Sequence, residues 1–402
     1  MQKNYSKNSP SQTGNGNDKL VERNVVALGW VAFFGGLAQD MIQPVLPTFY
    51  SSVLGLNKEF IGLIEGAMMT IVSLMKIGAG YLSDYLGLRK LIVFIGYAFS
   101  AIARFSLGFV NSGVAVLGLR WTDGVGKGLK DAPRDALVAG SAGHRKLGFA
   151  FGIQRTLDTL GSVAGPIITY GLLRIWVGNS YLYRRIFFIA GIIAFVPLVI
   201  IGLLVKERKS PINKQIISLA PLRGTFAAFL GIMLLFTLGN SSDAFLILRA
   251  EDVGITSTTI PLVVALFNLT SALTAIPAGK ISDKIGRRKA ITIGWGVYAL
   301  TYLGFAVARS AWMIWIFYAF YGLYYAFTEG SSKAMVAELV PEANRGAAYG
   351  LFNASIGVMA LPASVIAGYL WNISAAAPFT FGAIMAFVAF VALWFLPKIK
   401  AK

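Results

Sequence analysis

The sequence predicts an all-α polytopic membrane protein, and three observations lead to this fold class. Of the 402 residues, 56% are hydrophobic and 13% are charged, whereas about 25% charged residues is normal in a soluble protein. Long uncharged runs recur from Val25 to Pro397, and roughly 20 apolar residues suffice to cross a bilayer as a helix. A loop motif also occurs twice, which indicates two pseudo-symmetric six-helix bundles built on one plan.

The predicted elements are twelve transmembrane helices, six in each half. Residues 1–20 are polar and lack the apolar centre of a signal peptide, so we expect a disordered N-terminal tail. The two bundles are expected at 21–205 and 224–402, joined by a polar cytoplasmic linker at 206–223. The predicted helices cover residues 25–50, 60–82, 91–110, 114–138, 148–173, 185–205, 224–248, 259–280, 290–308, 311–338, 346–372 and 376–397.

The repeated loop motif joins the second predicted helix to the third and the eighth to the ninth. Its first copy, at residues 80–90, reads GYLSDYLGLRK, and its second, at residues 279–289, reads GKISDKIGRRK. The copies lie about half the chain apart, whereas solenoid repeats have periods of roughly 20–50 residues. This distance favours a duplicated bundle, and the glycines of both copies suit tight turns and close approach of helices.

The loops also predict an orientation. Lys and Arg gather in loops expected on one face of the membrane, including both motif copies and the linker at 206–223. The opposite face carries Glu251 and Asp252, with Arg184 and Arg185 as the exception. The positive-inside rule therefore places both termini in the cytoplasm of a multi-pass protein of the plasma membrane. This distribution accounts for the net charge of +18, so no nucleic-acid partner is expected.

Composition argues against enzyme chemistry. The chain has no cysteine, and His144 is its single histidine, so we expect no metal site, no thiol chemistry and no histidine-based triad. No G-x-x-x-x-G-K-[ST] loop is present in the sequence, which argues against a pump driven by ATP.

Charged residues within the predicted helices mark the candidate site, because a charge inside a bilayer is costly unless it faces a cavity, a partner or a pathway. On the fourth helix, charges from Arg120 to Arg134, with Asp123 and Lys127 among them, recur at spacings of three and four and so share one face. We expect this face to line a central cavity. Opposite signs alternate, so ion pairs can satisfy most of the charges, and residues 130–135 are expected to be structural.

Further charged candidates occur on the other helices of the first half. Asp40 precedes Pro44 and Pro47, which break the helical hydrogen-bond ladder and favour a bend. Arg104 is expected to be a lone buried cation. The alternative to a functional role, for any one of these charges, is that it forms a neutralised ion pair which only fixes the packing of the helices. The candidates of this group are Asp40, Glu65, Arg155 and Asp158.

The second half repeats part of this pattern. Asp243 lies on the first helix of its half, as Asp40 does, and Asn268 is a neutral polar candidate. The acid-Gly-x-x-Lys pattern of residues 123–127 recurs from Glu329 to Lys333. Aromatic residues before Glu329 are expected mainly to pack or to anchor the helix, with stacking on a substrate as the alternative: Trp312, Trp315, Tyr318, Tyr321, Tyr324 and Tyr325.

These motifs resemble the major facilitator superfamily of secondary transporters, in its prokaryotic efflux-permease-like branch, over essentially the whole chain after the tail. The repeated loop is similar to the signature loop of that family. Residues 120–126 (RWTDGVG) are similar to its fourth-helix pattern linked with proton coupling. Gly161, Gly165 and Pro166 are similar to its fifth-helix antiporter motif G-x-x-x-G-P, and the likeness ends after Pro166.

The resemblance implies two halves around a central cavity that opens alternately to either side. In such a protein Asp84 and Asp283 would cap or pair across the interface between the halves, and basic residues of the loops would hold the inward gate. The implied gating residues are Gly80, Asp84, Gly87, Arg89, Lys90, Gly279, Asp283, Gly286, Arg288 and Lys289.

We therefore expect a secondary active transporter that exports a small molecule by alternating access in exchange for protons. An acid facing the cavity would carry the proton, with Asp40, Asp123, Glu65 and Asp158 as candidates in this order, under the influence of Arg120. The expected partners are the lipid bilayer and a small-molecule substrate. A monomer driven by the proton gradient would need no cofactor.

Two alternatives stay open. One is uptake or exchange of an organic anion that Arg120, Lys127 and Arg155 would bind. The other is a transporter-like membrane sensor or scaffold, which would bind a ligand without moving it.

Overall fold

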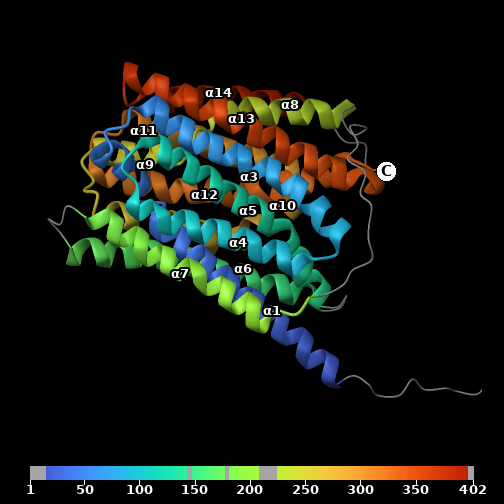
Figure 1. Cartoon of the computed structure of the whole chain (residues 1–402). Coiled ribbons are helices and arrows are strands. Elements are labelled where there is room, and N and C mark those ends of the chain that lie inside the picture. Colours follow the sequence, from blue (N-terminus) through green and yellow to red (C-terminus); the bar gives the residue numbers. More distant parts are fainter. Residues whose placement is uncertain (1–14, 143–146, 177–180, 208–223, 397–402) are drawn as a thin grey trace, which may run out of the picture.

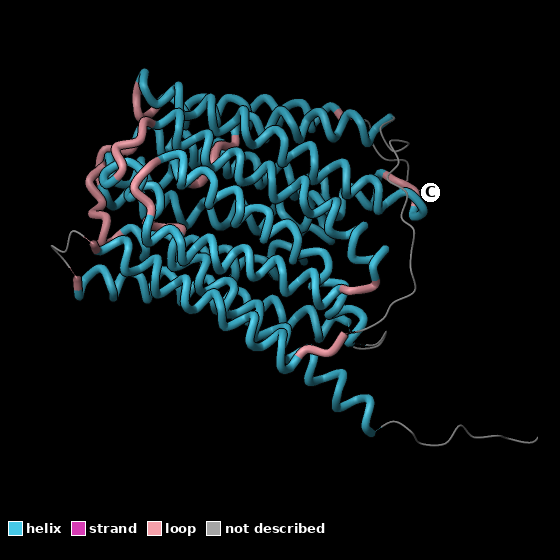
Figure 2. Tube along the Cα trace, viewed as in Figure 1, coloured by secondary structure: helices cyan, strands magenta, loops and turns pink. Residues whose placement is uncertain are grey.

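The computed structural model describes residues 15–142, 147–176, 181–207 and 224–396, and the regular structure in these ranges is helical throughout. The long helices run side by side and form an elongated bundle (Figures 1 and 2). The first half contains α1 (Asn15–Ile42), α2 (Leu46–Thr48), α3 (Lys58–Leu86), α4 (Arg89–Ser106), α5 (Gly113–Ala142), α6 (Leu147–Ile175) and α7 (Leu182–Leu204). The second half contains α8 (Gly224–Gly239), α9 (Ala244–Asp252), α10 (Ile260–Ile285), α11 (Arg287–Val307), α12 (Ala311–Leu339), α13 (Arg345–Ile373) and α14 (Ala377–Phe395).

The helices have the lengths and composition of membrane spans. In the described ranges, nine helical segments are long and apolar enough to cross a bilayer. Helices α5, α6 and α12 have 30, 29 and 29 residues but are not among the nine; they carry the candidate residues Asp123, Asp158 and Glu329. The predicted class of all-α polytopic membrane protein is confirmed, and the count of twelve crossings stays a prediction.

The first helix of each half is interrupted. Pro44, which has no N–H to donate, lies between α1 and α2, as the sequence suggested. The continuous helix predicted at 224–248 is wrong, because residues 240–243 separate α8 from α9. Their short polar side chains compete with the helix for backbone hydrogen bonds. The freed carbonyl oxygen of Gly239 accepts a hydrogen bond from Tyr298 Oη at 3.1 Å, so the break is satisfied inside the protein.

The end of α7 is tied to its own half. The backbone N–H of Lys206 donates to Asn24 Oδ1 at 2.9 Å, and Asn24 Nδ2 donates back to the Lys206 carbonyl at 3.0 Å. Glu207 accepts a hydrogen bond from the backbone N–H of Lys90 at 2.9 Å. The rest of the predicted linker lies outside the described residues. At the other end of the half, α1 begins at Asn15, inside the segment predicted as a polar tail.

The core of the second half is rich in stacked aromatic rings. The rings of Phe236 and Trp295 stack with centroids 4.7 Å apart, and those of Tyr298 and Tyr302 stack at 4.0 Å. These pairs add to the apolar area that the rings bury. Three members of the predicted aromatic set are buried in this core, in agreement with a packing role: Tyr318, Tyr321 and Tyr324.

The halves meet closely at the end of the bundle where α3 begins. Helix α3 crosses α13 at Gly62, where an added Cβ would lie 2.2 Å from the carbonyl oxygen of Ser364. Only glycine permits such an approach of two helices. Helices α2 and α9 also meet at this end, where Thr48 Oγ1 donates to Glu251 Oε1 at 2.5 Å. These contacts seal one end of the interface between the halves.

Replacement of Gly62 by leucine is expected to open this seal. Overpacking costs about 1–3 kcal/mol, and a shift of 1.4 kcal/mol changes a two-state equilibrium by about tenfold. Because the chain has no cysteine, Thr48→Cys can report on the seal through its labelling by a water-soluble maleimide. Gly62→Leu should raise this labelling rate by about tenfold. Gly78→Leu is the matched control, since an added Cβ there meets no atom within 4 Å; equal rates in both variants contradict the proposed seal.

The two loop copies lie at the opposite end of the bundle. Gly87 and Gly286 occupy equivalent positions and adopt positive φ angles of 65° and 90°, which confirms the tight turns expected there. The other glycine pair shows no close helix approach in this conformation. An added Cβ on Gly80 would meet only Ala132 Cβ of the same half, at 3.9 Å, and one on Gly279 would meet nothing within 4 Å.

The described polar groups of the second loop bond within their own half. Asp283 pairs with Arg287, and Arg288 donates to the carbonyl oxygen of Trp394 at the end of α14. Asp283 therefore forms no ion pair across the interface with a described residue in this conformation, whereas the family resemblance implies that it would cap or pair there. The side chain of Asp84 is not among those described.

Candidate functional site

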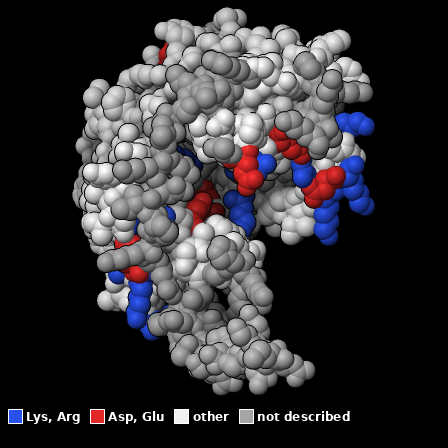
Figure 3. All heavy atoms as spheres, turned by 90° about the vertical axis from the view of Figure 1, so that its right-hand side faces the viewer, with Lys and Arg blue, Asp and Glu red and all other residues white. Residues whose placement is uncertain are grey.

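A polar cavity of about 420 Å³ lies between the two halves. Its walls come from α1, α2, α3, α5 and α6, from Tyr97 of α4, and from residues between 242 and 247, just before and at the start of α9. Ligand sites commonly have volumes of about 300–1,000 Å³. Figure 3 shows the molecule from the end where α1 begins, and charged side chains are visible inside a hollow that is open there. The seal between α3 and α13 closes the opposite end.

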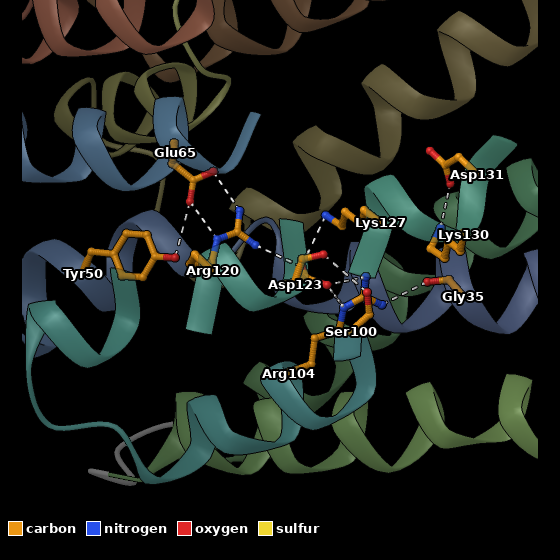
Figure 4. A network of polar contacts seen from close by, with 10 residues as sticks. All are labelled: Gly35, Tyr50, Glu65, Ser100, Arg104, Arg120, Asp123, Lys127, Lys130 and Asp131. Carbon is orange, nitrogen blue, oxygen red and sulfur yellow. Dashed lines mark hydrogen bonds and ion pairs between the residues drawn. The ribbon is translucent and has the colours of Figure 1, made fainter. Parts of the chain in front are cut away.

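The core of the site is a buried ion-pair network on α3, α4 and α5 (Figure 4). Asp123 accepts a hydrogen bond from Arg104 Nε at 3.2 Å. Its other oxygen pairs with Arg120 Nη1 and Lys127 Nζ, both at 3.4 Å. Arg120 also holds Glu65 with two hydrogen bonds, Nε–Oε1 at 3.2 Å and Nη2–Oε2 at 2.8 Å. Paired donors of this kind fix side-chain geometry, so the network is rigid.

A second group of charges lies nearer the open end of α5. Asp131 pairs with Lys76 Nζ at 2.9 Å and with Lys130 Nζ at 3.0 Å. The Lys130 ammonium also lies 4.9 Å from the ring centroid of Tyr97, close enough for a cation–π contact. Arg134 Nη1 donates to Tyr97 Oη at 3.2 Å. These residues line the cavity, and they have the internal partners expected of structural charges.

One ion pair crosses between the halves. Arg155 Nη2 of α6 lies 3.6 Å from Glu329 Oε2 of α12, and Lys333 Nζ pairs with Glu329 Oε1 at 3.1 Å. The side chains of Arg155 and Glu329 are 69% and 46% exposed, and exposed pairs contribute at most about 1 kcal/mol. This contact is therefore weak enough to break when the halves move.

The antiporter-like motif packs α6 against α1 and thereby positions two acids. An added Cβ on Gly161 would lie 2.3 Å from the carbonyl oxygen of Phe33, and one on Gly165 would lie 2.9 Å from the carbonyl carbon of Asp40. Thus α6 approaches α1 at backbone distance, which brings Asp40 and Asp158 to the same wall of the cavity. The role of these glycines is close helix packing beside the acids.

The carboxylates of the cavity divide into paired and unpaired groups. Asp40, Asp158 and Asp243 line the cavity, and none of them forms an ion pair with another described residue. Every basic residue of the cavity wall has a carboxylate partner among the described residues: Lys76, Arg120, Lys127, Lys130, Arg134 and Arg155. The acids without an ion partner among the described residues are therefore Asp40, Asp158 and Asp243, whereas the carboxylates of the network are shared, with three basic partners for Asp123 and two for Asp131.

Asp243 lies at the interruption before α9, on the wall contributed by the second half. Tyr321 Oη donates to its Oδ1 at 2.8 Å. A side pocket of about 20 Å³ opens beside it, lined by Asp40, Asp243, Asn268 and Tyr318 among others. Asn268 Nδ2 donates to the carbonyl oxygen of Ser162 at 2.7 Å and so links α10 to α6. The structure thus brings candidates from both halves to one place.

Sequence reasoning missed several partners within this site. The prediction of Arg104 as a lone cation is wrong, because it contacts Asp123, which is distant in sequence and on another helix. Lys76 was not singled out, although it is a single base in an otherwise apolar stretch of α3. The hydroxyl of Tyr321 was assigned to packing, whereas it also bonds Asp243. Contacts between helices account for each of these differences.

A membrane-embedded bundle whose halves enclose a polar cavity open at one end defines a transporter of small molecules, and not an enzyme. The family model described as Major Facilitator Superfamily matches residues 28–239 and 224–402. The chain therefore belongs to the Major Facilitator Superfamily, and it is a multi-pass membrane protein.

Comparisons with curated proteins agree with this assignment. The chain is 36% identical over 394 residues to the MFS-type transporter MJ1317 of Methanocaldococcus jannaschii, covering 96% of this chain and 98% of the relative. It is 23% identical over 334 residues to the multi-drug resistance efflux pump PmrA of Streptococcus pneumoniae, covering 78% and 81% of the two chains.

Solved structures show the same fold. The nucleoside transporter NupG superposes with a TM-score of 0.72 at 15% identity, over 92% of this chain and 97% of its own. A D-xylose–proton symporter superposes with a TM-score of 0.74 at 16% identity, over 94% and 98% of the two chains.

Proposed function

We propose that the protein is a proton-coupled exporter of a small molecule that works by alternating access. Multidrug efflux pumps among its relatives support the direction of transport. The plasma membrane and a cytoplasmic location of both termini are part of this proposal, supported by the basic loops at one end of the bundle. In that orientation the cavity of the present conformation opens to the cytoplasm. A monomer is part of the same proposal, and the proton gradient is the proposed source of energy in place of a cofactor.

The observation that carries the proposal is that both acids on the cavity wall formed by α1 and α6 lack an ion partner among the described residues. A group that carries protons must gain and lose its charge during the cycle. Asp40 and Asp158 can do so without breaking an ion pair with a described residue. Asp123 cannot, because its protonation would leave three buried cations around one neutral group. We therefore assign proton exchange to Asp40, with Asp158 beside it.

In the proposed cycle, protonation of Asp40 and binding of the substrate exclude one another at the cavity wall that carries Asp40 and Asp158. With the cavity open to the cytoplasm, loss of the proton leaves a charged carboxylate that accepts substrate. With the cavity open to the other side, protonation removes that charge and releases the substrate. A ligand shifts a two-state equilibrium only through its different affinities for the two states, and the proton supplies this difference here.

The alternative of organic-anion transport has less support in the cavity. It requires basic side chains that are free to bind the anion, and Arg120, Lys127 and Arg155 are each paired with a carboxylate. An anion would have to displace a paired carboxylate in a buried site, which leaves that carboxylate uncompensated.

Reconstituted vesicles test the coupling. Purified protein in liposomes that contain a pH-sensitive dye is exposed to a panel of compounds which raise its thermal stability, since specific binding stabilises the folded state. We expect active compounds to accumulate only when a pH gradient is imposed, and to consume that gradient as they do. Full flux without a gradient contradicts proton coupling. Binding without flux under any condition supports the sensor alternative, and protein-free liposomes are the control.

A further inference from the structure

The side pocket next to Asp243 has a size and a set of acceptors that point to a particular ligand group. It measures about 20 Å³ and shares Asp40, Gln43 and Asp243 with the main cavity. A site for one water molecule needs about 10–15 Å³ by this kind of measure. The pocket therefore admits a group of about the size of one water molecule, while the remainder of a ligand would lie in the main cavity.

Two carboxylates line this pocket, together with other polar side chains and with apolar ones such as Leu246, Val264 and Phe267. Asp40 and Asp243 contribute carboxylates that have no ion partner among the described residues. The hydroxyl oxygen of Tyr318 is buried and has no hydrogen-bond partner, and the residue as a whole is only 3% exposed. A buried polar atom without a partner is uncommon and costs roughly 1–3 kcal/mol. Tyr318 is one of the residues that line the pocket, and its hydroxyl has no hydrogen-bond partner among the described residues.

The hydroxyl of Tyr321 does not supply a free hydrogen-bond donor to this pocket. It already donates to Asp243 Oδ1 at 2.8 Å, which leaves one oxygen of the carboxylate and the Tyr318 hydroxyl free as acceptors. Asn268, on the same wall, donates one of its two amide N–H groups to the carbonyl oxygen of Ser162. The ligand group that complements this pocket is a small cation with several N–H donors. A primary ammonium group has three such donors.

The main cavity restricts the rest of the ligand. Gln39, Gln43 and Asp158 line it together with the two acids of the pocket, and Tyr97 is the aromatic residue of its wall. Large hydrophobic ligands usually find sites lined mainly by apolar and aromatic side chains. This wall offers hydrogen-bonding groups instead, so it suits a hydrophilic body.

We propose that the transported substrate is a hydrophilic primary amine whose ammonium group enters the pocket between Asp243, Tyr318 and Asp40. This inference rests on the proposed transport function but concerns binding alone. Asp243 and Tyr318 belong to the second half and Asp40 to the first, so the bound amine bridges the two halves. Quaternary ammonium compounds do not fit, because three methyl groups exceed the pocket.

Four probes with the same five-carbon chain test the choice of group: 1,5-diaminopentane, its permethylated bis-trimethylammonium analogue, 1,5-pentanediol and glutarate. Each is titrated into purified detergent-solubilised protein, with thermal unfolding and calorimetry as readouts. We expect the diamine alone to stabilise the protein, with affinity at least about tenfold above that of the other three, because only it fills the pocket with matched donors. Equal or tighter binding of the permethylated analogue overturns the proposal, as does the absence of diamine binding.

Variants locate the bound group. Asp243→Asn and Tyr318→Phe should each weaken diamine binding by about tenfold or more, as expected for loss of a hydrogen bond to a charged group. The matched controls are Asp135→Asn and Tyr369→Phe, which change residues outside the cavity wall, and they should bind as the parent does. Unchanged affinity in both pocket variants overturns the site. The titrations need no gradient, so diamine binding can succeed even where the vesicle assay contradicts proton coupling.

Discussion

Asp123→Asn is expected to lower the free energy of unfolding by about 3–5 kcal/mol, the loss measured when one partner of a buried ion pair is removed. The Asp123 side chain is 4% exposed and pairs with Arg104, Arg120 and Lys127. Arg120 keeps Glu65 as a partner, whereas Arg104 loses its carboxylate while 5% exposed. Equilibrium unfolding of the purified protein in mixed micelles measures the effect.

Asp283→Asn is the matched control for this experiment. Asp283 also pairs with an arginine, but its side chain is 63% exposed, and pairs of this kind contribute about 0–1 kcal/mol. Comparable losses in the two variants contradict the structural role of the buried network. A small loss of unfolding free energy in Asp123→Asn also contradicts the structural role of the network, since it shows that water reaches the three cations.

Asp40→Asn is expected to abolish accumulation of substrate driven by a pH gradient. For one-for-one exchange with protons, a gradient of one pH unit supports roughly tenfold accumulation, since 1.36 kcal/mol corresponds to a factor of ten. Asparagine cannot exchange a proton, so the accumulation ratio should fall to about one. Exchange of substrate down its own gradient continues with lower affinity, because Asp40 is lost from the pocket while Asp243, Tyr318 and the closing contacts remain. Vesicle uptake with and without a gradient separates the two processes.

Asp135→Asn serves as the control in that assay, because Asp135 is half-exposed on α5 and does not line the cavity. Its accumulation ratio should equal that of the parent protein. If Asp40→Asn still accumulates substrate, the proton site lies elsewhere, and Asp158→Asn then becomes the informative variant. Loss of both accumulation and downhill exchange in Asp40→Asn means that Asp40 acts in substrate binding alone.

Much of the fold follows from local chemistry that a sequence displays. Long apolar runs predict the helices, and the glycines of the repeated motif predict turns that the structure shows at Gly87 and Gly286. The interruption between α8 and α9 was not predicted. The apolar run is continuous around residues 240–243 apart from these polar residues, and a break there depends on partners such as Tyr298 and Ser364 from other helices.

The candidate site was predicted in part, because residues on one helix face can be grouped by their spacing. Arg120, Asp123 and Lys127 form contacts with one another, as that spacing suggests. Their partners on other helices, Glu65 and Arg104, depend on tertiary packing. For the same reason our proposed order of proton carriers differs from the order expected from the sequence. Asp123 was placed second, and the three cations around it are visible only in three dimensions.

The two halves differ in how easily their residues can change during evolution. The second half has a core of stacked aromatic rings, whereas the first half has a network of buried charges. In the network, each charge depends on several others, so an altered member leaves its neighbours uncompensated and compensating substitutions must arise together. Around Asp243 there are fewer such dependencies, because Tyr321 Oη donates to its Oδ1 and no described residue forms an ion pair with it. New substrate ranges are therefore more accessible to relatives through single changes on α10 and α12 than on α5. The first half is expected to keep the means of energy coupling while the second half diversifies its recognition.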